Sequence, residues 1–95
     1  MNFKTLDPVI HSQLRLAVMS LLKELREADF ILIREKTGAT PGNVSTQINK
    51  LKEAGYVQVV KTFRDNYPRT VCKITAKGMN AFEEYSQALQ TYVKL

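Results

Sequence analysis

Hydrophobic residues recur every three or four positions over the first 25 residues, the spacing typical of a helix with one broad buried face. Asp7 is suited to cap this helix and Pro8 to its first turn, which predicts one long helix ending near Leu25. Ser12 offers a second cap, so an interruption at His11 and Ser12 is an alternative. The apolar positions are Val9, Ile10, Leu14, Ala17, Val18, Leu21, Leu22 and Leu25.

Two shorter helical segments follow, separated by a turn. Asp29 is placed to cap the first, over about residues 30–36, and Gly38 to end it in a left-handed conformation. The Thr40–Pro41 pair supplies the cap and the first residue of the next helix, residues 41–54. Only one narrow stripe of that helix is apolar, so most of its surface is expected to be exposed. The stripe consists of Val44, Ile48 and Leu51.

The pattern changes after Gly55, where β-branched and aromatic residues become frequent. Residues 56–64 and 69–75 predict two strands joined by a turn at residues 65–68, which together make a β-hairpin. The adjacent Val59–Val60 pair disturbs strict alternation and is compatible with a bulge.

Thr75 is placed to cap a long last helix, from Ala76 to about Val93. Its apolar positions are spaced by three and four, close to a coiled-coil seam. The predicted order is helix, helix, helix, hairpin, helix in a single domain of residues 1–95. This is a mainly α chain with a β-hairpin (α+β), and the order describes a winged helix-turn-helix. The apolar positions of the last helix are Met79, Phe82, Tyr85, Leu89 and Tyr92.

The charges are unevenly distributed along the 95 residues. The formal net charge is +5, but the segment from Arg34 to Lys77 carries nine basic and three acidic residues, a net +6. A basic middle between near-neutral ends suits a polyanion-binding surface flanked by structural parts. A basic face that is merely solvated is the alternative.

The composition argues against several other classes. No apolar run approaches the roughly 18–20 residues of a membrane span, and the N-terminal residues lack the apolar stretch of a signal peptide. The single cysteine, Cys72, excludes an internal disulfide, which favours a reducing, cytoplasmic setting. With His11 as the only histidine and no base and nucleophile arranged beside Ser45, we expect no metal site, no cofactor and no enzymatic activity.

The exposed side of helix 41–54 has the chemistry that reads DNA bases. Amides bond adenine edges, lysine reaches guanine or phosphate, and threonine methyls pack on thymine methyls. The expected base-reading residues are Asn43, Thr46, Gln47 and Lys50. The free N–H groups at the helix start, near Thr40 and Gly42, suit a phosphate, although Thr40 also fits a plain capping role. A solvated polar face is again the alternative.

The hairpin adds basic side chains next to that helix. Arg64 and Arg69 flank the turn, where an arginine can enter a minor groove or hold a phosphate. Lys61 and Lys73 fit the same role, or they keep an exposed strand edge from pairing with other chains. The expected backbone contacts are Thr40, Gly42, Arg64, Arg69 and Lys73.

Three segments together carry a family resemblance. Residues 10–18 look like the opening helix of small winged-helix regulators. Residues 41–57 resemble their recognition helix, with its L-x-x-x-G-hydrophobic ending. Residues 69–78 resemble a second wing strand that runs into the start of a final helix. The whole chain is thus similar to the small MarR/ArsR-like winged-helix family of DNA-binding transcriptional regulators. The resemblance implies a homodimer that binds double-stranded DNA at an inverted repeat, with residues 41–54 in the major groove and residues 57–75 on the backbone or minor groove.

Surplus apolar residues at both ends of the chain agree with a homodimer. The terminal parts, about residues 1–25 and 76–95, would form the two-fold interface. The alternative is that the last helix folds back on the first helix of the same chain. The expected interface residues are Phe3, Leu6, Ile10, Phe82, Tyr85, Leu89 and Tyr92.

Departures from these relatives narrow the function. The C-x-C pair of metal-sensing ArsR members is absent, and we expect Cys72 to face inward as a small hydrophobe. The chain is shorter than typical MarR proteins, whose extra helices build an effector pocket, so the sequence does not identify an effector. Two other functions remain open, a protein-docking winged helix and a nucleic-acid binder without sequence preference.

Overall fold

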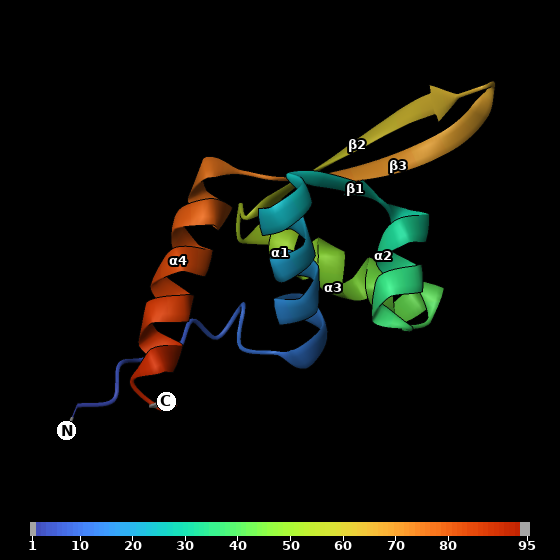
Figure 1. Cartoon of the computed structure of the whole chain (residues 1–95). Coiled ribbons are helices and arrows are strands. Elements are labelled where there is room, and N and C mark those ends of the chain that lie inside the picture. Colours follow the sequence, from blue (N-terminus) through green and yellow to red (C-terminus); the bar gives the residue numbers. More distant parts are fainter. Residues whose placement is uncertain (1, 94–95) are drawn as a thin grey trace.

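The computed structural model describes residues 2–93. The α+β winged helix-turn-helix predicted from the sequence is confirmed. In Figure 1 the first three helices gather below the sheet, the hairpin projects away from them, and the last helix stands on the opposite side. The elements are α1 (Gln13–Leu25), β1 (Glu27–Asp29), α2 (Phe30–Thr37), α3 (Pro41–Glu53), β2 (Val57–Arg64), β3 (Tyr67–Ile74) and α4 (Ala76–Gln90).

The first helix begins later than its apolar pattern predicts. Asp7 closes only one turn, because its Oδ1 accepts from the Val9 N–H and its carbonyl oxygen from the His11 N–H, each at 2.8 Å. The Ser12 N–H then donates to the carbonyl of Ile10, two residues earlier, at 2.7 Å. This bond replaces the bond to the residue four positions earlier that a continuous helix would make. Ser12 itself is extended and precedes the helix. The prediction of one long helix from residue 8 is wrong, and the interruption at Ser12 is confirmed. Ser12 stands at the cap position, but its side chain makes no capping hydrogen bond.

The helix-turn-helix unit forms where its local signals lie. Asp29 Oδ1 accepts from the Leu32 N–H at 2.8 Å and caps α2, while Gly38 ends α2 with a left-handed φ of 69°. Thr40 Oγ1 accepts from the Asn43 N–H at 3.2 Å and caps α3. These contacts fix where α2 stops and α3 starts, as the sequence predicts.

The hairpin has a tighter turn and a more regular ladder than expected. Strands β2 and β3 pair antiparallel in unbroken register from Val57–Ile74 to Arg64–Tyr67, so no bulge forms. Only Asp65 and Asn66 make the turn, with φ of 50° and 67°, the backbone of a tight two-residue hairpin loop. Tyr67 and Pro68 were predicted in the turn. They are strand residues, because a two-residue turn lets β3 begin at Tyr67, opposite Arg64.

A third strand was not predicted. Strand β1 pairs with β3 in antiparallel register, with Ala28 opposite Cys72, which gives the sheet order β1-β3-β2. Three residues are too few to show an alternating pattern in the sequence. The strand anchors the base of the hairpin directly to the start of α2.

The core lies between the helices and the inner face of the sheet. The predicted buried stripe of α3 is confirmed, and strand β3 adds Cys72. The predicted stripe of α1 is confirmed only in part, because Val18 and Leu22 are buried but Ala17 and Leu25 are exposed. Met19, which the pattern did not include, is fully buried. Within residues 2–93, no helix is long and apolar enough to cross a membrane. The largest fully buried side chains are Ile10, Met19, Leu22, Ile33, Leu51, Val18, Val44 and Cys72.

Helix α4 folds back against α1 of its own chain. The sequence analysis gave this fold-back as the alternative to a dimer interface. The list of expected interface residues must therefore be corrected. Ile10, Phe82 and Tyr85, expected at a dimer interface, are at most 8 % exposed because the chain's own core buries them. Phe3 and Tyr92 remain 60 % and 46 % exposed, and their rings stack at 5.0 Å between centroids.

Gly78 provides a stability test of how the start of α4 packs against Tyr56, the residue before β2. A Cβ at Gly78 would lie 2.2 Å from the Tyr56 carbonyl oxygen, which is backbone and cannot move aside cheaply. We expect Gly78→Ala to destabilise the chain by about 2 kcal/mol, within the range for overpacked sites. Thermal unfolding measures this. The matched control is Gly42→Ala in open space on α3, expected to stabilise by roughly 0.5–1 kcal/mol. Equal melting of Gly78→Ala and the wild type would contradict the packing.

Candidate nucleic-acid interface

Helix α3 presents most of its surface to solvent. Its buried residues are Val44, Ile48 and Leu51, and the opposite side is polar. The residues predicted to read bases or hold backbone here are exposed, except for Gln47, which is half-buried. The structure therefore brings together Thr40, Gly42, Asn43, Thr46, Gln47 and Lys50 along one helix.

One flank of α3 faces the N-terminal turn. Arg15 of α1 donates from Nη1 to Gln47 Oε1, and Gln47 Nε2 donates to Asn43 Oδ1 at 3.0 Å. Lys50 lies on the same flank and lines a hollow with Pro8 and Arg15. Sequence reasoning did not include Arg15 in the site, because α1 is predicted as a core helix.

The other flank of α3 faces the hairpin across a shallow groove of about 450 Å³. Ser45, Asn49 and Lys52 were not among the expected site residues. Lys61 also lines the groove. The sequence carries a signal for this position, because Lys61 follows the core-facing Val59 by two residues and so lies on the same face of β2. The groove is lined by Phe30, Ser45, Ile48, Asn49, Lys52, Val59, Lys61 and Thr70.

The basic residues of the hairpin divide between its two faces. The register pairs Lys61 with Thr70 on the groove side, whereas Thr62–Arg69 and Arg64–Tyr67 alternate to the other face. Lys73 shares that second face and is exposed. The hairpin can therefore meet a polyanion from more than one side.

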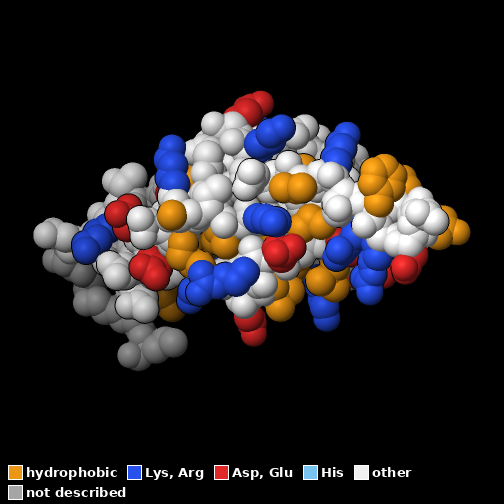
Figure 2. Space-filling view, turned by 90° about the horizontal axis from the view of Figure 1, so that it is seen from above, with side chains coloured by type: hydrophobic (Ala, Val, Ile, Leu, Met, Phe, Trp, Pro, Cys, Tyr) orange, Lys and Arg blue, Asp and Glu red, His pale blue; other side chains and the backbone are white. Residues whose placement is uncertain are grey.

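Figure 2 shows the molecule from above, with Lys and Arg side chains spread over this face, several of them near the hairpin end, and Asp and Glu side chains between them. The hairpin tip also carries exposed rings: Phe63 is 74 % exposed and Tyr67 75 %. Phe63 and Tyr67 are thus free to pack on a sugar or a base edge.

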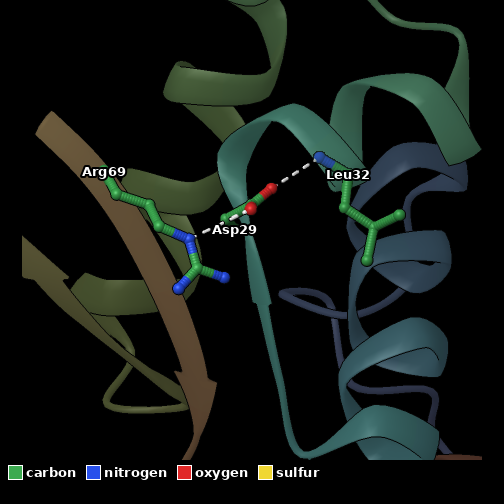
Figure 3. Close-up of polar contacts among 3 residues, drawn as sticks. All are labelled: Asp29, Leu32 and Arg69. Atoms are coloured by element: carbon green, nitrogen blue, oxygen red, sulfur yellow. Dashed lines mark hydrogen bonds and ion pairs between the residues drawn. The ribbon is translucent and has the colours of Figure 1, made fainter. Parts of the chain in front are cut away.

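Arg69 is not the free cation that its place near the turn suggests. Its Nε donates to Asp29 Oδ2 at 3.2 Å, while the other carboxylate oxygen accepts from the Leu32 N–H, as Figure 3 shows. The hydrogen bond from Leu32 is the largest cause and lowers the pKa of Asp29. Burial opposes it, while the hydrogen bond and charge of Arg69 and the charge of Arg64 lower the pKa further. Within residues 2–93 the Arg69 Nη nitrogens have no protein partner and remain available to a phosphate.

The remaining chemistry-bearing residues have packing roles. Burial raises the pKa of the Cys72 thiol to about 11, so the thiol is a small core hydrophobe at neutral pH. His11 Nδ1 lies 3.0 Å from the hydroxyl of the buried Tyr85. In the described part of the chain, no three His, Cys, Asp or Glu side chains converge to hold a metal ion.

Comparison with known proteins agrees with this geometry. A family model described as a winged helix DNA-binding domain matches residues 14–93. An uncharacterized protein of Methanocaldococcus jannaschii is 34 % identical over 77 residues, which are 81 % of this chain and 84 % of the relative.

Solved structures show the same fold. A transcriptional regulator homologue from Pyrococcus horikoshii OT3 is similar with a TM-score of 0.83 and 32 % identity, covering 88 % of this chain and 83 % of the other. NadR in complex with 4-hydroxyphenylacetate has a TM-score of 0.74 at 21 % identity, over 90 % of this chain and 62 % of NadR, a likeness of fold alone. The resemblance to small winged-helix DNA-binding regulators, stated from the sequence, is confirmed.

The Asp29–Arg69 pair predicts a pH-dependent stability. Because the folded pKa of Asp29 lies below its ordinary 3.8, its charge stabilises the fold above that pH, and this contribution is lost as the pH falls through the folded pKa. Asp29→Asn keeps a capping oxygen but loses the ion pair, so we expect it to cost about 0.5–1 kcal/mol at pH 7. Urea unfolding measures the difference. The difference in unfolding free energy between the wild type and Asp29→Asn should shrink below about pH 4, and a constant difference would contradict this assignment.

Proposed function

The chain belongs to the winged helix DNA-binding domain family and is a DNA-binding regulator, and from this premise we propose how it engages DNA. Helix α3 enters the major groove and reads sequence. The hairpin holds the neighbouring backbone or minor groove. Two copies bind an inverted repeat. The observation that carries this proposal is the continuous surface on which the polar side of α3 and the basic hairpin meet across one groove.

The dimensions and chemistry of α3 support the reading role. Its 13 residues make a rod about 20 Å long, and a major groove about 12 Å wide admits such a rod. Asn43, Thr46, Gln47 and Asn49 supply amide and hydroxyl groups to base edges, and Lys50 supplies an ammonium. At the helix start, Thr40 and Gly42 lie where free backbone N–H groups favour a phosphate.

The hairpin supports a backbone role because it carries cations on both of its faces. Arg64 is exposed near the tip, Lys73 is exposed near the base, and Arg69 keeps its Nη donors free of protein partners among residues 2–93. Lys61 reaches from the groove side. Such contacts orient a protein on the duplex and supply sequence-independent affinity.

The two chain ends support the dimer. The Lys4 N–H donates to Thr91 Oγ1 at 3.1 Å, and the Tyr92 hydroxyl donates to the Lys4 carbonyl at 2.7 Å. These bonds hold Phe3 against Tyr92 as one exposed aromatic pair. We place the two-fold interface on this pair with the half-buried Leu6 and Leu89. Binding to successive major grooves on one face of the DNA requires the two α3 helices to be about 34 Å apart.

The family and its relatives argue for a regulator that binds DNA and not for an enzyme. We propose a cytoplasmic location, which a DNA-binding role and the free thiol of Cys72 both support. A protein-docking role is disfavoured, because the outer side of α3 is polar and the hairpin is basic.

Selection of bound sequences from a random duplex pool tests the proposal, with the solution mass measured alongside. We expect an enriched inverted repeat with half-sites about one helical turn apart, and a dimer mass. Salt-sensitive binding without enrichment would instead indicate a non-specific nucleic-acid binder. No DNA binding would indicate a docking domain.

Arg64→Ala tests the role of the hairpin. Removing one phosphate contact should weaken binding to selected and random DNA alike, and should reduce the slope of log affinity against log salt by about 0.9. The control is Lys23→Gln, which removes the same charge from α1, where Lys23 covers the ring of Phe82. An unchanged slope for Arg64→Ala, or an equal effect of both substitutions, would contradict the hairpin contact.

A further inference from the structure

Arg15 connects the N-terminal turn to the reading helix. It stands on α1, half-buried, and its guanidinium is held by three acceptors from two parts of the chain. Nε donates to the Val9 carbonyl and Nη2 to the Pro8 carbonyl at 3.4 Å. Nη1 donates to Gln47 Oε1 on α3. A side chain fixed at three points offers Gln47 a donor in one constant place.

Hydrogen-bond chemistry then dictates the direction of the next contacts. A guanidinium only donates, so Gln47 must turn its oxygen toward Arg15 and its Nε2 away from it. That Nε2 also only donates, so Asn43 must meet it with Oδ1, and the two atoms lie 3.0 Å apart. The hydrogen bonds Arg15–Gln47–Asn43, which we call the relay, therefore all run in one donor-to-acceptor direction. Their direction leaves the Asn43 Nδ2, a donor, at the free end of the relay.

Asn43 is exposed in the first turn of α3, and its Nδ2 has no protein partner within residues 2–93. We propose that Arg15 is a positioning residue and that this relay makes Asn43 a hydrogen-bond donor to DNA. The inference rests on the proposed function and names the base edge that Asn43 selects. Guanine fits best, because N7 and O6 are adjacent acceptors, and cytosine fits worst, because its N4 amino group is a donor.

The relay should also make Asn43 more selective between bases than a free asparagine side chain. A free asparagine presents its oxygen and nitrogen in either order and suits adenine as well as guanine. Here Asn43 Oδ1 already accepts from Gln47, so one orientation is occupied before DNA arrives. Preorganisation of this kind removes the cost of ordering the side chain on binding.

The test is the base preference at one position of the selected site, defined as the position whose preference disappears in Asn43→Ala. In the wild type we expect guanine there. Arg15→Ala releases both amides, and the preference for guanine over cytosine should fall by roughly tenfold, within the range of one bidentate contact. The preferences at the positions read by Thr46, Asn49 and Lys50, with which Arg15 makes no hydrogen bond, should stay unchanged.

Gln47→Glu is the sharper variant because it reverses the polarity. A carboxylate accepts from Arg15 and can only accept from Asn43, so Asn43 should turn its Nδ2 toward residue 47 and present Oδ1 to DNA. The preferred base at that position should change from guanine to a base with an amino donor, adenine or cytosine. Arg15→Lys is the conservative control, since an ammonium also only donates and should keep guanine.

A structural role for Arg15 would lower the melting temperature without changing which base is preferred. Thermal unfolding of each variant is therefore measured together with its selection, and Gln47→Glu carries the test if Arg15→Ala does not fold. Guanine retained at full preference in both Arg15→Ala and Gln47→Glu would overturn the relay and leave the proposed function intact. The same holds for a wild-type preference for cytosine. No enriched site in the wild type would overturn both.

Discussion

The interface depends on the burial of three residues of α3. Val44, Ile48 and Leu51 form a stripe only wide enough to hold the helix by one side, and all three lie in the core. This contact fixes the rotation of α3 about its axis, so it decides which side chains face the hairpin, the solvent and the N-terminal turn. A wider stripe would bury polar residues that the proposed DNA contact needs.

The hairpin is held in relation to α3 by contacts outside the hairpin itself. Strand β1 pairs with β3, and Asp29 at its end caps α2 with one oxygen and holds Arg69 with the other. The carboxylate thus joins the helix-turn-helix unit to the hairpin by two charge-assisted hydrogen bonds. Because the hairpin beyond β1 has no third strand beside it, this junction sets the direction in which its tip projects.

Local signals in the sequence predict the helix boundaries well. Asp29, Thr40 and Thr75 each cap a helix within three residues, so their effect does not depend on the rest of the fold. The start of α1 was ambiguous because Asp7 and Ser12 both suit a cap. Strand β1 has no local signature at all, since it exists only through its pairing with β3. Periodicity likewise identifies the outer side of α3, but it could not place Arg15 against Gln47, a contact between residues 32 positions apart. The apolar seam of α4 was read as a dimer surface because a sequence does not show that α4 folds back on α1.

One titration tests the joint role of α3 and the hairpin most directly. The isotope-labelled protein is titrated with a duplex that carries its selected site, and the changes in its amide chemical shifts are measured by NMR. The largest shifts should fall on the exposed residues of α3, on the groove residues Lys61 and Thr70, and on the hairpin tip. The core-facing residues of α4 should change little. Largest shifts on the outer side of α2 or on α4, with α3 and the hairpin unchanged, would contradict the account.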